Sequence, residues 1–260
     1  MNWMAERALR GESLAPGVLI VDWHVHLGRW IVMKTPADDG DEMVRLAKAA
    51  GVSKLVVNGT IWPDLRASND MIAGFAARHP DTVVPFAVAN PYQNDVAGEI
   101  RRCFEELGFR GVKLHAMHEL IHSPRGISSY TREWDRLFAY LSEKSAPVLY
   151  HGVVTEEMIR DWPGVPFVQA HGIYSVANLE RLARYPNFHV DTPSTQNKAW
   201  DVRAAVDVIG ADRILWGTDA PYDDFAHRLG VVLDSGLAEG DIRKILGLNA
   251  ARLLGMERRS

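Results

Sequence analysis

Short apolar segments alternate with longer segments of helical period along almost the whole chain. The short segments are rich in β-branched residues, which is typical of buried strands, and the longer ones repeat apolar residues at the spacing of one helix face. Trp134, Leu137, Phe138 and Leu141 form one such stripe. The pattern predicts eight strands, at residues 17–22, 53–59, 82–90, 111–115, 147–151, 166–171, 187–191 and 213–219.

The strict alternation of strands and helices predicts a parallel sheet, because parallel neighbours need crossover helices that cover the sheet. Eight such units in about 250 residues match the count and length of a (β/α)8 barrel. A doubly wound sheet is the alternative, but it usually carries a glycine-rich phosphate loop after its first strand, and no GxGxxG is present there. No repeat or linker interrupts the chain, so we expect an α/β fold, a (β/α)8 TIM barrel, forming a single domain over residues 1–260.

Polar side chains gather where the predicted strands end. In a (β/α)8 barrel these ends share one face, and the active site lies there. The residues at these positions are Asp22, His24, His26, Lys113, His115, His151, His171, Asp191 and Asp219, which include five of the ten histidines. Chance placement explains this poorly, and we expect the side chains to converge. The other histidines fit other roles: His79 and His227 on the surface, His189 in the core, and His118 and His122 in a loop that could touch a substrate.

His24 and His26 lie two residues apart, so in an extended strand both imidazoles point to the same side. With His151 and Asp219 they make a ligand set suited to zinc, iron or manganese, with room for a water molecule. Zinc lowers the pKa of bound water from 15.7 to about 7, and Asp219 would take the proton and pass it to a leaving group. His171 would polarise a substrate carbonyl or hold the attacking water.

Lys113 has three interpretations, and the sequence hardly separates them. It could pair with a carboxylate such as Asp191 or Asp219, it could be a carboxylated lysine that bridges two metals, or it could bind the carboxylate of a substrate. His115 faces the same way two residues later and could serve a second metal or a substrate. Arg29 follows the first strand and, like Lys113, could meet an anionic group.

The composition narrows the class of protein. The chain is 47% hydrophobic and 24% charged, its net charge is -4, and it lacks a basic run, so we expect no nucleic-acid partner. No apolar stretch predicts a secretion signal or a membrane span. The single cysteine, Cys103, excludes an internal disulfide and suits the cytoplasm, and its apolar stripe predicts a place in the core.

Six stretches together are more specific than any one of them: VDWHVHLG, GFRGVKLHA, APVLYHG, FVQAHG, RILWGTDAPY and ILGLNAARLLG, between residues 21 and 255. In this order they resemble the amidohydrolase superfamily, and within it the amidohydrolase-related (amidohydrolase 2) branch of TIM-barrel metal-dependent hydrolases and decarboxylases. The resemblance implies a divalent metal, foremost zinc, as one ion or two. It implies that His24, His26, His151 and Asp219 bind it.

The same resemblance implies that His171 is catalytic or binds a second metal, that Asp219 shuttles the proton, and that Asn249 is structural. Two departures concern the loops that shape the pocket. Ala116 stands where a proline is common, and Ile173 stands where a second glycine is expected. The fourth strand also lacks the glutamate of the related metal-dependent DNases, which argues against nuclease activity.

The leading functional hypothesis is a metal-dependent hydrolase of a small amide, ester or lactone. The alternative is a non-oxidative, metal-dependent decarboxylase of an aromatic or unsaturated carboxylic acid. A barrel without activity that serves as a scaffold is the third hypothesis, but it predicts an eroded site. The partner would be a small molecule, carboxylated in either reaction if Arg29 and Lys113 meet it, and family members often form homo-oligomers. Loop side chains would wall an apolar pocket or only pack the barrel rim: Trp30, Met33, Trp62, Tyr92 and Tyr222.

Overall fold

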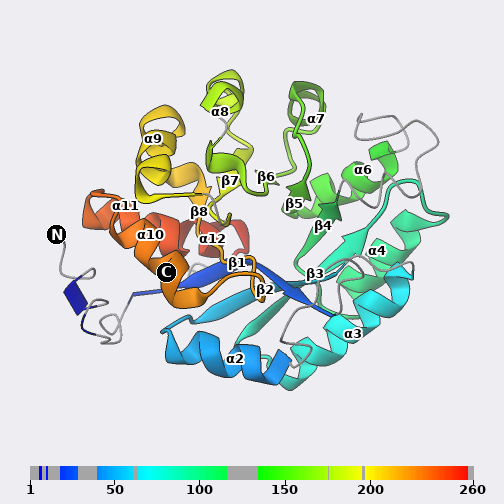
Figure 1. Cartoon of the computed structure of the whole chain (residues 1–260). Helices are drawn as coiled ribbons and strands as arrows, with labels where there is room; N and C mark the ends of the chain where they lie inside the picture. The colour runs from blue at the N-terminus through cyan, green and yellow to red at the C-terminus, as the bar shows by residue number, and fades with distance from the viewer. Residues whose placement is uncertain are drawn as a thin grey trace.

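The computed structural model describes residues 6–7, 10, 18–28, 40–60, 64–115, 134–174, 176–194 and 197–256. Within these residues, eight parallel strands form one sheet whose spatial order is the order of the sequence. The strands are β1 Val21–Leu27, β2 Lys54–Gly59, β3 Val83–Ala89, β4 Gly111–His115, β5 Val148–His151, β6 Phe167–Gln169, β7 Phe188–Asp191 and β8 Ile214–Leu215. The sheet curls into a barrel inside a ring of helices (Figure 1), which confirms the predicted (β/α)8 TIM barrel.

The helices follow the strands as crossover connections. They are α2 Gly40–Ala49, α3 Leu65–Arg78, α4 Val96–Glu105, α6 Asp135–Lys144, α7 Glu156–Asp161, α8 Val176–Leu182, α9 Ala199–Ile209, α10 Phe225–Leu233, α11 Glu239–Arg243 and α12 Asn249–Leu253, with short turns η2 Gly172–Tyr174, η3 Ala211–Arg213 and η4 Lys244–Leu248. Side-chain caps begin several of them: Asp64 accepts from Ala67 N at the start of α3, and Thr155 accepts from Met158 N at the start of α7. No helix among these is long and apolar enough to cross a bilayer.

The first and last strands differ in extent from the prediction. The first was expected at residues 17–22, but β1 runs from Val21 to Leu27 because the histidine segment stays paired with β2, with His26 opposite Asn58. The last was expected at 213–219, but only Ile214–Leu215 form a regular strand. An apolar run marks where a strand is buried, whereas backbone pairing decides where it ends.

The seam between β1 and β8 closes the barrel by individual contacts. Trp23 N donates to Trp216 O at 2.9 Å, and Asp219 N donates to His24 O at 2.8 Å. The Asp22 carboxylate accepts from the Thr218 hydroxyl at 2.6 Å and from the Thr218 N–H at 3.0 Å. Burial raises the pKa of Asp22 to about 7, while these hydrogen bonds oppose the rise. The seam therefore joins the two segments that carry His24 and Asp219.

The core has an inner and an outer part. Inside the barrel, Trp23 packs edge-on against Phe86 with ring centroids 5.3 Å apart, and Ala250 and Leu254 at α12 join this inner cluster. Asn249 Nδ2 donates to Ala211 O and Ile214 O, which agrees with the structural position that the resemblance implied. The outer core lies between strands and helices and includes Cys103, whose thiol pKa is raised by burial.

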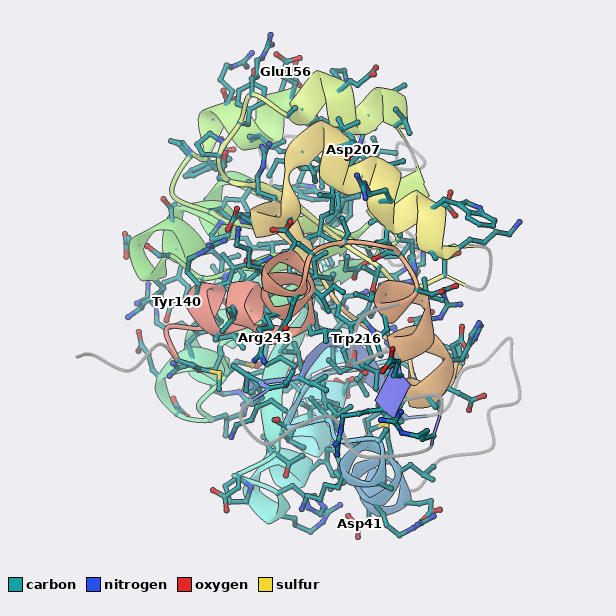
Figure 2. The ribbon with its side chains drawn as sticks, turned by 90° about the vertical axis from the view of Figure 1, so that its left-hand side faces the viewer. Asp41, Tyr140, Glu156, Asp207, Trp216 and Arg243 are labelled. Atoms are coloured by element: carbon teal, nitrogen blue, oxygen red, sulfur yellow. The ribbon has the colours of Figure 1, made fainter. Side chains whose placement is uncertain are left out.

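Figure 2 contrasts the interior with the surface. Trp216 lies fully buried inside the fold, whereas Asp41 at the lower edge of the view and Asp207 on α9 have side chains that are more than half exposed. This distribution keeps the charged side chains of the helices in water while their apolar faces cover the sheet. A buried charged residue in this protein is therefore the exception that needs an explanation.

Gly247 in η4 leaves no room for a side chain. A Cβ built there would lie 2.3 Å from the backbone oxygen of Leu19, which cannot swing aside as a side chain could. We expect Gly247→Ala to destabilise the fold by about 1–3 kcal/mol, the usual cost of overpacking. Gly230→Ala in α10 is the matched control, because its Cβ meets nothing within 4 Å, and it should be neutral or stabilising by about 0.5–1 kcal/mol. Urea unfolding of both variants measures the difference, and equal midpoints would contradict it.

Candidate metal centre

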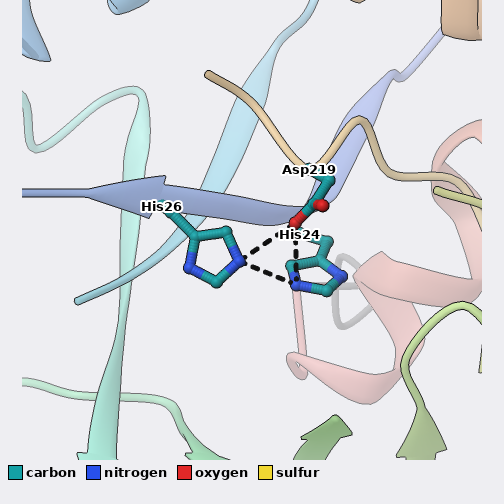
Figure 3. Close-up of side chains that lie close together, drawn as sticks. All are labelled: His24, His26 and Asp219. Carbon is teal, nitrogen blue, oxygen red and sulfur yellow. Dashed lines mark hydrogen bonds and ion pairs between the residues drawn. The ribbon is translucent and has the colours of Figure 1, made fainter. Parts of the chain in front are cut away.

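Three side chains meet at the carboxyl end of β1, as Figure 3 shows. His24 and His26 extend from β1, and Asp219 comes from the segment that follows β8. The two Nε2 atoms are 3.1 Å apart, and Asp219 Oδ1 lies 3.4 Å from His24 Nε2 and 3.0 Å from His26 Nε2. The histidines are almost fully buried, whereas the Asp219 side chain is 23% exposed and forms the open side of the cluster.

The backbone turns sharply where two of the strand-end residues sit. Asp219 has φ 65° and His171 has φ 57°, so both adopt the left-handed conformation that residues other than glycine rarely take. The Asp219 N–H is held by His24 O at 2.8 Å, and the His171 N–H donates to the Asp191 carboxylate. These bonds keep the unusual conformations and aim both side chains at the end of the barrel.

The spacing of the three donor atoms fits a divalent metal. Metal–nitrogen and metal–oxygen bonds of about 2.0–2.2 Å place neighbouring ligand atoms about 3.0–3.5 Å apart at octahedral or tetrahedral angles. The observed separations of 3.0, 3.1 and 3.4 Å fall in that range. Two imidazole nitrogens with a carboxylate oxygen are also ligands that zinc, iron and manganese accept.

Asp191 at the end of β7 orients the centre. His24 Nδ1 lies 2.8 Å from Asp191 Oδ2, and Lys113 Nζ lies 2.7 Å from His24 Nε2. An ammonium group can only donate and an ionised carboxylate can only accept, so we assign the ring hydrogen to Nδ1 and the lone pair to Nε2. Burial raises the pKa of Asp191, against the attraction of Lys113. The sequence placed Asp191 at a strand end but did not include it among the site residues, because a partner of a ligand leaves no spacing signal of its own.

Lys113 on β4 reaches the same point. Its Nζ lies 2.7 Å from His24 Nε2, and the residue is 1% exposed. Burial lowers the pKa of Lys113 to about 8, and the carboxylates of Asp219 and Asp191 oppose that fall. Although burial opposes it, the hydrogen bond from His26 holds the pKa of Asp219 below its usual value, and Lys113 adds to this effect.

The other predicted histidines stand in a row beside the cluster. His171 Nδ1 donates to Pro193 O at 2.7 Å, which leaves its Nε2 as the free acceptor of the ring. The ring centroids are 5.0 Å apart for His24 and His171, 4.6 Å for His171 and His151, and 4.2 Å for His151 and His115. Burial, with Lys113 nearby, lowers the pKa of His151 to about 2, which keeps this imidazole neutral as metal ligation requires.

His151 stands apart from the tightest groups of donors. Among the described residues, two groups have all their donor atoms within 4.8 Å of one another: His24, His26 and Asp219, and His24, His171 and Asp191. His151 belongs to neither group, although its ring lies beside that of His171. Its role as a ligand stays a prediction, as do those of His115 and His171.

Several other expectations concern the walls of the site. Tyr222 lies beside it, with its ring centroid 5.7 Å from that of His26, whereas Tyr92 packs edge-on against Trp134. Arg29 lies outside the described residues, and so do the remaining loop candidates Trp30, Met33, Trp62, His118 and His122. His79 and His227 hydrogen-bond to Asp41 and Asp223 near the surface.

His189 is buried in the core, as expected, and burial lowers its pKa to about 4. Above pH 6.5 the residue is neutral in both the folded and the unfolded chain, so it does not affect stability. Below pH 6.5 only the unfolded chain takes up the proton, and stability falls until the pH reaches the folded pKa. We expect the titration of this residue to lower the free energy of unfolding by about 2 kcal/mol between pH 7 and pH 5. The free energy of unfolding of His189→Leu should fall by that much less over this interval, and parallel curves would contradict the expectation.

Comparisons with known proteins show which family and which enzymes this chain resembles. A model of the Amidohydrolase family matches residues 21–256. In sequence, the chain is similar to the gamma-resorcylate decarboxylase of Rhizobium radiobacter, with 24% identity over 252 residues that cover 75% of this chain and 76% of that protein.

Two solved structures share the fold. A 2,6-dihydroxybenzoate decarboxylase in complex with 2,6-dihydroxybenzoate has a TM-score of 0.75 and 18% identity, covering 93% of this chain and 100% of the other. A dihydroxybenzoic acid decarboxylase from Polaromonas sp. JS666, with bound manganese and the inhibitor 2-nitroresorcinol, has a TM-score of 0.73 and 18% identity, covering 92% and 98%.

Proposed function

Because the chain belongs to the Amidohydrolase family, we propose that it is a metal-dependent enzyme that decarboxylates an aromatic or unsaturated carboxylic acid without oxidation. The observation that carries the proposal is the amine of Lys113 beside the cluster of His24, His26 and Asp219, because it offers a cation for a carboxylate next to a metal site. The gamma-resorcylate and dihydroxybenzoate decarboxylases among the similar proteins support this reaction over the hydrolysis that led our sequence-based hypotheses.

The residues that would hold the metal are His24, His26 and Asp219, with His151 as the predicted fourth ligand. When bound, the metal would act as a Lewis acid that fixes and polarises oxygen groups of the substrate. We predicted zinc, whereas manganese is bound in the Polaromonas structure, and the nitrogen and oxygen donors of this site suit both. One divalent ion at this cluster is the simplest assignment, and a homo-oligomer stays a prediction.

The side chains of the chain itself divide the work of the reaction. Lys113 is placed to bind the carboxylate that will leave, and the His171 Nε2 atom accepts a hydrogen bond from a substrate hydroxyl. Asp219, the most exposed member of the cluster, takes a proton from the bound substrate or from water and delivers it to the ring carbon. The bond from that carbon to the carboxylate then breaks, its electron pair returns to the ring, and carbon dioxide leaves.

The test is a direct assay of carbon dioxide. Protein loaded with manganese or zinc is incubated with hydroxylated benzoates and unsaturated dicarboxylates, and in parallel with lactones, esters and amides. We expect release of carbon dioxide from at least one acid, and its loss in Asp219→Asn. Hydrolysis of a lactone, ester or amide without any release of carbon dioxide would overturn the proposal in favour of hydrolysis.

A further inference from the structure

The Nε2 atom of His24 has one lone pair, which either the Lys113 amine or a metal ion can use. Since the ring hydrogen sits on Nδ1 and is donated to Asp191, Nε2 can only accept a hydrogen bond or bind a metal. In the structure the nearest atom to it among the site residues is Lys113 Nζ at 2.7 Å, closer than His26 Nε2 at 3.1 Å and Asp219 Oδ1 at 3.4 Å. The lysine amine therefore uses the lone pair on which metal binding depends.

We propose that Lys113 competes with the metal for this site and must withdraw from His24 before a metal ion can bind there. The inference rests on the metal site proposed above. A hydrogen bond and a coordinate bond cannot share one lone pair, so the Lys113 contact has to break when the metal arrives. An ammonium group and a divalent ion placed a few ångströms apart also repel each other, and burial strengthens this repulsion.

The surroundings of Lys113 explain why an amine occupies this place. The residue is fully buried and interacts with the carboxylates of Asp219 and Asp191, so it offsets their negative charge. Both oxygens of Asp191 are already in use, one by His24 and one by the His171 N–H. A displaced amine would keep the attraction of these carboxylates and gain a partner on the open side of the cluster when a carboxylated substrate binds there.

The two other interpretations of Lys113 predict different effects on metal binding. A carboxylated lysine would be a ligand, so its removal would weaken metal binding. A lysine that only binds substrate would still repel the metal through its charge, so its removal would also strengthen metal binding. The sign of the change therefore separates a carboxylated lysine from the other two roles. Structures with and without manganese separate competition from repulsion alone, because only competition requires the contact between Lys113 Nζ and His24 Nε2 to break.

The experiment is a calorimetric titration of metal-stripped protein with manganese and, separately, with zinc. The variant is Lys113→Met, whose unbranched side chain is one heavy atom shorter than that of lysine and carries no donor. Lys54→Met is the matched control, because Lys54 lies at the start of β2 and donates to the backbone oxygen of Asp81. We expect Lys113→Met to bind the metal about tenfold tighter or more, as the loss of a competing charged hydrogen bond implies, and Lys54→Met to match the wild type.

Equal or weaker binding by Lys113→Met overturns the competition while leaving the metal site intact, provided that wild type binds and His24→Ala does not. Absence of metal binding in wild type and Lys113→Met alike would overturn the metal site together with the competition. Crystals of the wild type with and without manganese distinguish competition from charge repulsion alone, and they also decide the matter should Lys113→Met fail to fold. The contact between Lys113 Nζ and His24 Nε2 must be present without the metal and broken with it, and a contact retained in both refutes the proposal.

Discussion

Replacing His24 by alanine should lower the affinity for a divalent metal by more than about 100-fold, the upper end of what removal of an outer partner of a ligand costs. The expectation follows from the position of this ring, because its Nε2 contacts both His26 and Asp219 while its Nδ1 is fixed by Asp191. Decarboxylation should fall with the bound metal. Metal content after dialysis and calorimetric titration give the measurement.

A surface histidine provides the control for this change. His79 follows the last residue of α3 and hydrogen-bonds to Asp41, so His79→Ala should retain the affinity of the wild type. Circular dichroism establishes that both variants are folded. Retained metal binding in a folded His24→Ala variant would show that the centre lies elsewhere.

Asp191→Asn should reduce metal affinity by about 10- to 100-fold, although Asp191 itself does not have to touch the metal. An asparagine offers only one acceptor oxygen, whereas Asp191 accepts from both His24 Nδ1 and the His171 N–H. In the variant an amide N–H faces one of these two donors. When it faces His24, the imidazole can respond by moving its hydrogen to Nε2, where it blocks the metal.

An aspartate-to-asparagine change on the surface is the control, because it removes a carboxylate far from the metal centre. Asp207 lies on α9 with its side chain 62% exposed, so Asp207→Asn should leave metal affinity unchanged. The readout is the dissociation constant for manganese from competition with a chelator. An affinity of Asp191→Asn equal to that of wild type would mean that the metal alone orients His24.

The order and type of the elements follow from hydrophobic periodicity, but their limits do not. The spacing of Leu46 from Met43 and of Val176 from Leu179 also predicts buried helix faces. Leu46 and Val176 are nevertheless 45% and 41% exposed, because each lies at the margin of its apolar stripe. β1 continues through two histidines because pairing with β2 outlasts the apolar run. Both differences arise where tertiary contacts, and not side-chain polarity, decide the outcome.

The convergence of strand-end residues was predictable, whereas their division of labour was not. His24, His26 and Asp219 meet as the barrel geometry requires. The contact of Lys113 with an imidazole instead of a carboxylate depends on side-chain rotamers, which have no periodic signal in the sequence. The same holds for Asp191, whose partners are set by the left-handed backbone of His171 and by the tautomer of His24.

The position of the metal centre at the seam between the first and last strands links metal binding to the stability of the fold. Asp22 and Thr218, which bond across this seam, are 196 residues apart in the sequence. A metal held by His24, His26 and Asp219 would cross-link the first strand of the barrel to the segment that follows its last strand. Binding energy would then reach the whole fold, because a ligand that prefers the native state shifts the unfolding equilibrium of all of it. The metal would thus stabilise the closed form of the barrel.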